Sequence, residues 1–388
     1  MDIAEKESVL EAARRIAPLI RASANEVEAN RQLPRPVFEA LADGGIFLMA
    51  VPRALGGREV TMPEYVQVIE ELAQADASTA WAVNQGTIYG TYAARMRPEV
   101  AREIWIDTPR SVVSNSPAPT GQAIPVPGGY RISAEQGFST GCMHASWIAA
   151  HAQVYENGEP KLKDGKPEGM YCLIPKTQVK IVDTWNTSGM RGTGTNHFKI
   201  KDVFVPAERT VLSAAQSLDS GGPLYKIPRT LAFACGDATV ALGVARSCIN
   251  AFYELAGAKI PRGTPRLLRD QPLMQLKVGQ AEATLRAGRA YLMNSIDELW
   301  ADAVTDGPIA LERRVAIRLS TTHAIRLAAQ VVDSIYEAAG VTAVFKSHVI
   351  QRYFQDIHVI TQHVQASSSH YEVVGRHWMG LSIEDSRI

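Results

Sequence analysis

"WNTSGMRGTGTNHFKIKDVFVPAERT", residues 185–210, joins two different kinds of backbone. Its first part holds three glycines and three of its four threonines beside Trp185 and Arg191. The segment "NHFKIKDVFVP" then alternates polar and apolar residues with the period of two that is typical of a β-strand. Flexible, hydroxyl-rich backbone next to a Trp and an Arg suits a loop that packs against a flat, hydrogen-bonding ligand. The stretch therefore predicts a ligand-binding loop that leads into a strand.

Short strands of this kind are expected over residues 111–215. The segment "SVVSNSPAPTGQAIPVPGGYRIS" (111–133) places Pro and Gly between short alternating runs. The segment "GMYCLIPKTQVKIVD" (169–183) is rich in Val, Ile and Tyr. Together these patterns predict a central β domain at residues 111–215.

Helical patterns flank this region on both sides. Apolar residues recur at helical spacing near the N-terminus, which predicts an N-terminal helical domain at residues 1–110. After about residue 225, four long amphipathic helices are expected, the last over 349–380, and they predict a C-terminal four-helix bundle domain at 216–388. The predicted fold class is α+β, in the order helices, β domain, bundle.

Composition excludes several classes of partner. Lys+Arg and Asp+Glu number 40 each, so the charge balance does not favour a nucleic-acid-binding protein. No uninterrupted apolar run reaches the length of a membrane span, and the charged, amphipathic N-terminus has no secretory pattern, so we expect a cytoplasmic protein. The four scattered cysteines predict buried thiols of a reducing compartment, without a disulfide or a metal site: Cys142, Cys172, Cys235 and Cys248.

Three segments resemble the acyl-CoA dehydrogenase fold, and the resemblance covers essentially the whole chain. "GYRISAEQGFSTGCMHASW" (129–147) resembles the flavin-contacting strand of that fold. "GMRGTGT" leading into "VFVP" resembles its second flavin-side segment. "EAAGVTAVFKSHVIQRYFQDIHVI" (337–360) resembles its glycine-containing loop and Arg-Asp helix, with Arg352 and Asp356 at the matching places.

The resemblance also bears on the chemistry. Acyl-CoA dehydrogenases carry a catalytic Glu eight residues after that Asp, but here Val364 stands in that place. The segments "DIHVITQH" and "FSTG" resemble instead the two-component flavin-dependent monooxygenases, which take reduced flavin from a separate reductase; Thr140 replaces the serine that is common there. The chain shows no GxGxxG after a strand, so a nicotinamide site of its own is not expected.

The resemblance implies an enzyme that binds reduced FMN or FAD and O2. It would oxygenate a small organic substrate, aromatic or heteroaromatic, through a C4a-hydroperoxyflavin that must be kept dry. Its partner would be an NAD(P)H-dependent flavin reductase, and the fold usually assembles as a homotetramer. Related enzymes place a substrate-pocket His where this chain has Tyr89 and Tyr92, so a simple phenol is not the expected substrate.

Site residues follow from the same alignment of motifs. The catalytic candidates are His363, Thr140 and Asn115. The candidates for flavin contact are Phe138, Ser139, Thr140, Gly141, Trp185, Arg191 and Thr193. The candidates for the substrate pocket are Tyr89, Tyr92, Ser116 and His358.

Other interpretations stay open at this point. His363 fits equally well as a packed helix residue beside His358 and His370, and the spacing of the three histidines does not predict a metal site. Thr140 could be a plain strand residue and Arg191 part of a surface ion pair. For the whole chain, the alternatives are an acyl-CoA dehydrogenase with a relocated base, a sugar-amine N-oxygenase of the same fold, and a non-catalytic flavin-binding protein.

Overall fold

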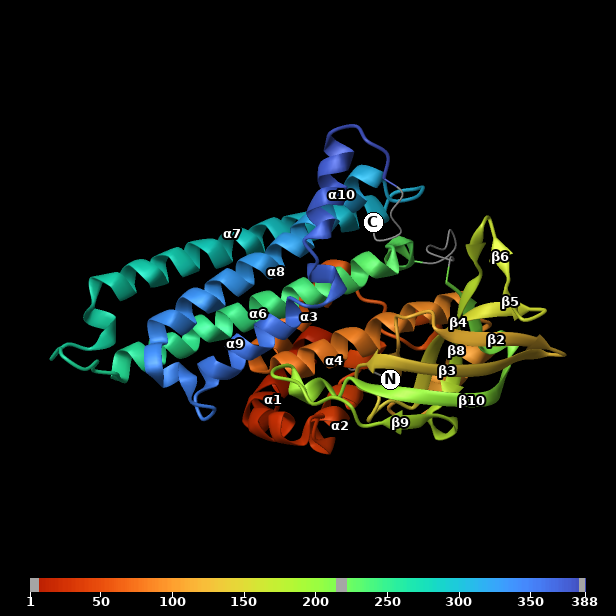
Figure 1. The fold of residues 1–388 in the computed structure, drawn as a ribbon, viewed down its shortest axis with the longest axis horizontal. Coiled ribbons are helices and arrows are strands. Elements are labelled where there is room, and N and C mark those ends of the chain that lie inside the picture. The colour runs from red at the N-terminus through yellow and green to blue at the C-terminus, as the bar shows by residue number, and fades with distance from the viewer. Residues whose placement is uncertain (1–6, 214–221, 384–387) are drawn as a thin grey trace, which may run out of the picture.

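Long C-terminal helices and a β-sheet form the two ends of the molecule, and the N-terminal helices pack along one side between them (Figure 1). The computed structural model describes residues 7–213, 222–383 and 388. The strands fall between residues 113 and 212, with helices before and after them, as predicted for an α+β chain. The predicted domain boundary at 110/111 stays a prediction, and the one at 215/216 lies outside the described residues.

Five α-helices precede the sheet in the described part of the chain. Helix α1 begins with a capping box in which Ser8 accepts from the Glu11 amide, and its predicted apolar face is buried. Every residue of α4 is buried, because α4 packs against α3, α6 and β1. The helices are α1 (Val9–Asn30), α2 (Arg35–Asp43), α3 (Met62–Ala75), α4 (Ala77–Ile88) and α5 (Pro98–Arg102).

The central sheet has the order β11-β8-β4-β2-β3-β10-β9, with β1 and β5 paired to β4. Strand β10 is antiparallel to both β3 and β9. The strands are β1 (Val113–Asn115), β2 (Gly121–Val126), β3 (Gly129–Ser139), β4 (Trp147–Glu156), β5 (Glu159–Pro160), β8 (Gly169–Pro175), β9 (Lys180–Val182), β10 (Asn196–Pro206) and β11 (Thr210–Leu212); β6 (Leu162–Lys163) and β7 (Lys166–Pro167) form a separate hairpin.

Strands β4 and β8 are buried on both faces. On one face Trp147 and Tyr171 join the apolar core of the helices, and on the other Ile148 and Cys172 join the apolar core of the sheet. Successive side chains of a strand point to opposite faces, so both sets can be apolar only where both faces are covered. The sheet is therefore fixed against the helices, and the cavity described below lies where they meet.

The C-terminal part begins with three long helices that lie side by side (Figure 1): α6 (Arg229–Ala258), α7 (Pro272–Ala303) and α8 (Leu311–Ala339). Among the described residues, only α6 is long and apolar enough to cross a membrane, and 94% of that window is buried inside the protein. Packing against α3, α4, α8 and α9 accounts for its apolar length. All four cysteines are buried and free, as the sequence predicted.

The prediction of one helix over 349–380 is wrong. Helix α9 (Val349–Ile360) ends near Thr361, and α10 (Ser369–Trp378) starts anew. Between them His363 has extended backbone, with φ −69° and ψ 148°. The chain breaks because Gln365 turns inward, where its amide bonds Arg318 and the backbone carbonyl of Thr230. This break places His363 beside the cavity.

Candidate active site

A cavity of about 610 Å³ lies between the sheet, α4, the start of α6 and the segment that follows α9. It brings together seven of the residues that the sequence singled out: Tyr89, Asn115, Phe138, Thr140, Trp185, Thr193 and His363. These residues come from five separate parts of the chain, so their convergence is a property of the fold.

An exposed aromatic pair forms one wall of this cavity. Phe138, at the end of β3, is 64% exposed, and its backbone has the left-handed φ of 61°. Its ring centroid lies 6.4 Å from that of Trp185, at an interplanar angle of 80°. A large apolar side chain that is left open in a backbone conformation rare for Phe is costly unless a ligand covers it.

Three threonine hydroxyls form a chain beneath that wall. Thr193 Oγ1 donates to the Met190 carbonyl over 2.9 Å and lies 2.6 Å from Thr195 Oγ1, which lies 2.9 Å from Thr140 Oγ1. Each hydroxyl has one proton. Because Thr193 gives its proton to Met190, Thr195 donates to Thr193 and Thr140 donates to Thr195. Thr140 therefore keeps only acceptor capacity for a ligand.

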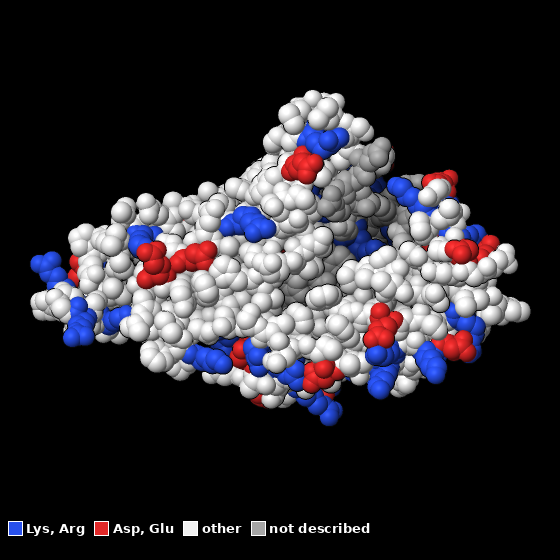
Figure 2. Space-filling view, in the orientation of Figure 1, with Lys and Arg blue, Asp and Glu red and all other residues white. Residues whose placement is uncertain are grey.

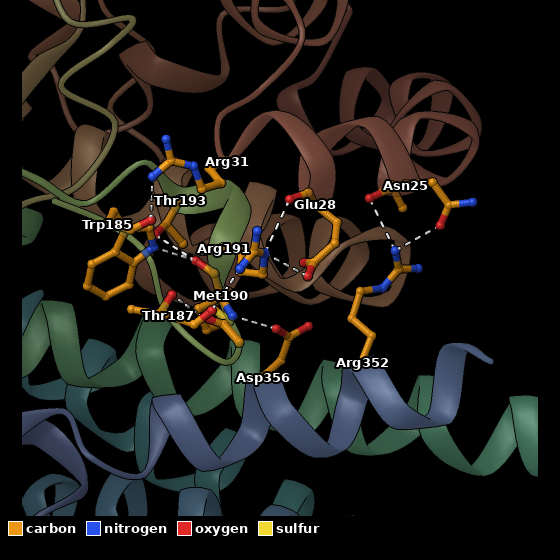
Figure 3. A network of polar contacts seen from close by, with 12 residues as sticks. Asn25, Glu28, Arg31, Trp185, Thr187, Met190, Arg191, Thr193, Arg352 and Asp356 are labelled. Carbon is orange, nitrogen blue, oxygen red and sulfur yellow. Dashed lines mark hydrogen bonds and ion pairs between the residues drawn. The ribbon is translucent and has the colours of Figure 1, made fainter. Parts of the chain in front are cut away.

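The loop of residues 185–194 is held in place from both sides (Figure 3). Asp356 on α9 accepts from the Met190 amide over 2.5 Å, and the indole nitrogen of Trp185 donates to the Met190 carbonyl over 2.9 Å. Arg191 pairs with Glu28 of α1 over 3.0 Å and lies outside the cavity. Burial raises the pKa of Asp356 to about 7.

His363 also lines the cavity and lies beside the buried Asp237. Its Nδ1 lies 3.2 Å from Asp237 Oδ2, at ion-pair distance although the two atoms are not aligned for a hydrogen bond. The other oxygen of Asp237 accepts from Asn84 over 2.8 Å and from Gln85 over 3.1 Å. The edge of Trp81 packs against the imidazole at 5.0 Å, so the ring is held on two sides.

Tyrosines surround a guanidinium at the other end of the cavity. Tyr89 and Tyr171 line the cavity together with Arg229, the first residue of α6. Tyr92 is buried behind them and accepts a hydrogen bond from Arg229. Burial raises the pKa of Tyr89 and of Tyr92 well above the usual value. Both phenols are therefore neutral at physiological pH.

The remaining predicted residues lie around the cavity or away from it. Ser139 is buried, with its hydroxyl 2.7 Å from that of Ser114. The amide of Gly141 donates to the Thr193 carbonyl over 2.9 Å, so both residues support the cavity wall. His358 lies elsewhere: its side chain is 43% exposed and its Nε2 lies 2.9 Å from Asp333. The structure does not bring His358 into the substrate cavity.

Sequence reasoning missed Asp237, Arg229, Thr195 and Tyr171. Asp237 carried a signal, since it is the only charged residue in the apolar run "LAFACGDATVALGVA" (231–245). Arg229 had no such signal in the sequence, because a single Arg at the start of a helix is common on protein surfaces. Thr195 belongs to the "GTGT" segment, and only the structure shows that its hydroxyl links the other two.

The residues fit a flavin ring. The open Phe138 and Trp185 side chains offer flat apolar surface, and Thr140 offers a hydrogen-bond acceptor beside them. Ser116, between the lining residues Asn115 and Pro117, does not itself line the cavity, and its hydroxyl is buried without a hydrogen-bond partner among the described residues.

Comparisons with known proteins agree with this fit. The family model for the acyl-CoA dehydrogenase N-terminal domain matches residues 4–105, and the model for the C-terminal domain matches residues 235–368. Indole-3-acetate monooxygenase of Pseudomonas putida is 29% identical over 93% of this chain and 90% of its own length. The flavin-dependent monooxygenase oxygenase subunit HsaA of Mycobacterium tuberculosis is 28% identical over 99% of this chain and 98% of its own.

A solved structure extends the similarity to three dimensions. The crystal structure of 3-HSA hydroxylase from Rhodococcus sp. RHA1 superposes with a TM-score of 0.90 and is 26% identical in sequence. The superposition covers 99% of this chain and 100% of that chain. The similarity in fold therefore includes both the helices and the sheet.

Proposed function

We propose that this chain, which belongs to the acyl-CoA dehydrogenase family, is the oxygenase component of a two-component flavin-dependent monooxygenase. The observation that carries the proposal is the set of side chains around the cavity. Among the described residues that line it there is no Asp or Glu, whereas His363 and five threonines are present. A dehydrogenase needs a carboxylate there to remove the α-proton of an acyl-CoA; the cavity instead offers an imidazole and hydroxyls.

The reaction balances with one co-reactant besides O2. Reduced flavin, when bound, supplies two electrons and two protons, so that one oxygen atom enters the substrate and the other leaves as water. A separate NAD(P)H-dependent reductase would supply the reduced flavin. The monooxygenase relatives, one of them named an oxygenase subunit, support that arrangement.

The threonine chain favours the reduced cofactor. Thr140 can only accept a hydrogen bond from a ligand, because its proton goes to Thr195. The reduced ring carries an N–H at N5, and the oxidised ring carries an acceptor nitrogen there. In the flavin-contact role expected of it, Thr140 would lie beside N5, where an acceptor would pair with the reduced form and repel the oxidised form, so the site would select reduced flavin from solution.

His363 is the proton-handling group in this account. Its Nδ1 lies 3.2 Å from Asp237 Oδ2 and makes no hydrogen bond to a described residue. Such an imidazole can hold or deliver a proton at a substrate or oxygen atom. Trp81, Phe233 and Tyr89 keep the surrounding space apolar and limit access of water.

Several finer points complete the proposal. The cofactor is FMN or FAD, the location is cytoplasmic, and the assembly is a homotetramer that forms through the C-terminal helices. Exposed apolar residues after α8 support a partner subunit there: Val341 is 69% exposed, Val344 60% and Phe345 61%. The apolar lining of the cavity supports a small aromatic or heteroaromatic substrate.

Anaerobic titration with reduced and oxidised flavin tests the proposal. We expect the purified protein to be largely colourless and to bind the reduced form at least tenfold more tightly. Purification with tightly held yellow FAD that an acyl-CoA reduces would overturn the proposal in favour of a dehydrogenase.

A further inference from the structure

Arg229 is a cation in the cavity without an acidic partner among the described residues. Its guanidinium lies 4.7 Å from the ring centroid of Tyr171, 4.9 Å from that of Tyr92 and 5.9 Å from that of Tyr89. Its hydrogen bonds go to the phenol hydroxyls of Tyr92 and Tyr171. In contrast, Arg246, also on α6, pairs with Glu282 over 2.6 Å.

A second guanidinium adds to the positive charge at this end. Arg95 is partly buried, and its Nη1 is enclosed with no hydrogen-bond partner in the described part of the chain. Burial lowers the pKa of Arg95, and the charge of Arg229 lowers it further. Arg95 does not line the cavity, but its charge acts on Arg229 and adds to the positive potential that a negative group bound at Arg229 would meet.

The backbone points to the same conclusion. Arg229 is the first residue of α6, a helix of 30 residues, and no side chain caps its N-terminus. The positive end of the helix dipole adds to the two guanidinium charges. Figure 2 shows the surface hollowed between the sheet and the α10 end of the molecule, with basic atoms inside the hollow.

We propose that Arg229 binds the carboxylate of a small aromatic acid, which makes an aromatic carboxylate the substrate class of this enzyme. The inference rests on the proposed monooxygenase function, because Arg229 and His363 line the same cavity. The planar guanidinium suits a carboxylate, which can accept two parallel hydrogen bonds. Trp81, Tyr89 and Phe233 line the apolar part of the cavity, where the substrate ring would pack.

The alternative is that Arg229 only stabilises the fold through its contacts with the tyrosines. Binding measurements separate the two roles. Indole-3-acetate and phenylacetate, each paired with its neutral amide, are titrated into the holoprotein under anaerobic conditions with reduced flavin. We expect at least one acid to bind roughly tenfold to a hundredfold more tightly than its amide, the range of one charge-assisted hydrogen-bonded pair.

Variants of Arg229 complete the test. Arg229→Gln should bring the ratio of acid to amide affinity to within about twofold of one, and Arg229→Lys should retain part of the preference. If Arg229→Gln does not fold, the ratio of acid to amide affinity in the wild-type protein and in Arg229→Lys still shows whether Arg229 binds the carboxylate. No preference for either acid in the wild-type protein, or an unchanged preference in a folded Arg229→Gln protein, would overturn the inference.

A separate assay keeps this inference distinct from the proposed function. Neutral indole is supplied with reduced flavin and O2, and oxygenated product is measured. If indole is oxygenated but the protein binds neither acid more tightly than its amide, Arg229 does not bind a substrate carboxylate, and the proposed monooxygenase function still stands. Failure of the wild-type protein to bind reduced flavin removes the proposed function itself, and the inference falls with it.

Discussion

His363 Nδ1 lies 3.2 Å from Asp237 Oδ2, and Asp237 is fully buried in the middle of α6. The two residues are 126 positions apart in sequence and meet only because the chain breaks after α9. Asn84 and Gln85 both donate to Oδ1 of Asp237 and fix this side chain, whose Oδ2 lies at ion-pair distance from the imidazole. The pair therefore links the core of the helical domain to the cavity.

Replacement of His363 tests the proton-handling role. His363→Ala should lower the rate of substrate oxygenation by about a hundredfold to ten-thousandfold, the usual effect of losing a general acid or base. Its affinity for reduced flavin should stay within about twofold. His358→Ala is the matched control, because that side chain is exposed and lies away from the cavity. Equal turnover of folded His363→Ala and His358→Ala proteins would show that His363 only packs.

The polarity of the threonine chain can be reversed. Thr195→Val removes the acceptor for the Thr140 proton and frees Thr140 to donate to a ligand. The ratio of reduced-flavin to oxidised-flavin affinity should fall by about tenfold, the value of one hydrogen bond. Thr195→Ser keeps the hydroxyl and should keep the ratio. Fluorescence titration with reduced and with oxidised flavin gives the two affinities. An unchanged affinity ratio in Thr195→Val would refute the donor order assigned to the three threonine hydroxyls.

Phe138 should contribute to ligand binding and not to the stability of the fold. Because its side chain is 64% exposed, Phe138→Ala should leave the melting temperature nearly unchanged. The affinity for reduced flavin should fall about threefold to tenfold, the value of one aromatic contact. Phe204→Ala, also an exposed Phe of the sheet at 44%, should change neither quantity. A loss of stability in Phe138→Ala with unchanged affinity would assign the residue to packing.

The buried Asp356 makes stability depend on pH. Its pKa is raised by burial to about 7 from the ordinary 3.8, so between about pH 4 and pH 7 the folded state holds a proton that the unfolded state has lost. This group therefore stabilises the fold at low pH, and its contribution is lost as the pH rises through 7.

Asp356→Asn removes this titration and keeps an acceptor for the Met190 amide. The free energy of unfolding of the wild-type protein should fall relative to that of Asp356→Asn as the pH rises from 4 to 7, by up to about 4 kcal/mol. Urea unfolding of both proteins across this range measures the difference. Parallel pH profiles would contradict the buried, protonated state of Asp356.

The sequence predicted the order of helices and strands because apolar periodicity follows directly from which face of an element is buried. It did not predict the break after α9, since Thr361 to Ser369 contains neither Gly nor Pro and the cause is the distant partner of Gln365, Arg318. The same limit hid the role of Arg229. Its role depends on Tyr89 and Tyr92 from one segment, on Tyr171 from a distant strand, and on the lack of an acidic partner among the described residues.

A single turnover under ¹⁸O2 tests the central claim most directly. The protein is mixed with one equivalent of reduced flavin, an aromatic acid or indole, and ¹⁸O2, and the product is analysed by mass spectrometry. The account predicts a product that carries one ¹⁸O atom, with H2O2 well below one equivalent. Complete recovery of the oxygen as H2O2 with every substrate tried, together with reduction of the bound oxidised flavin by an acyl-CoA, would contradict it.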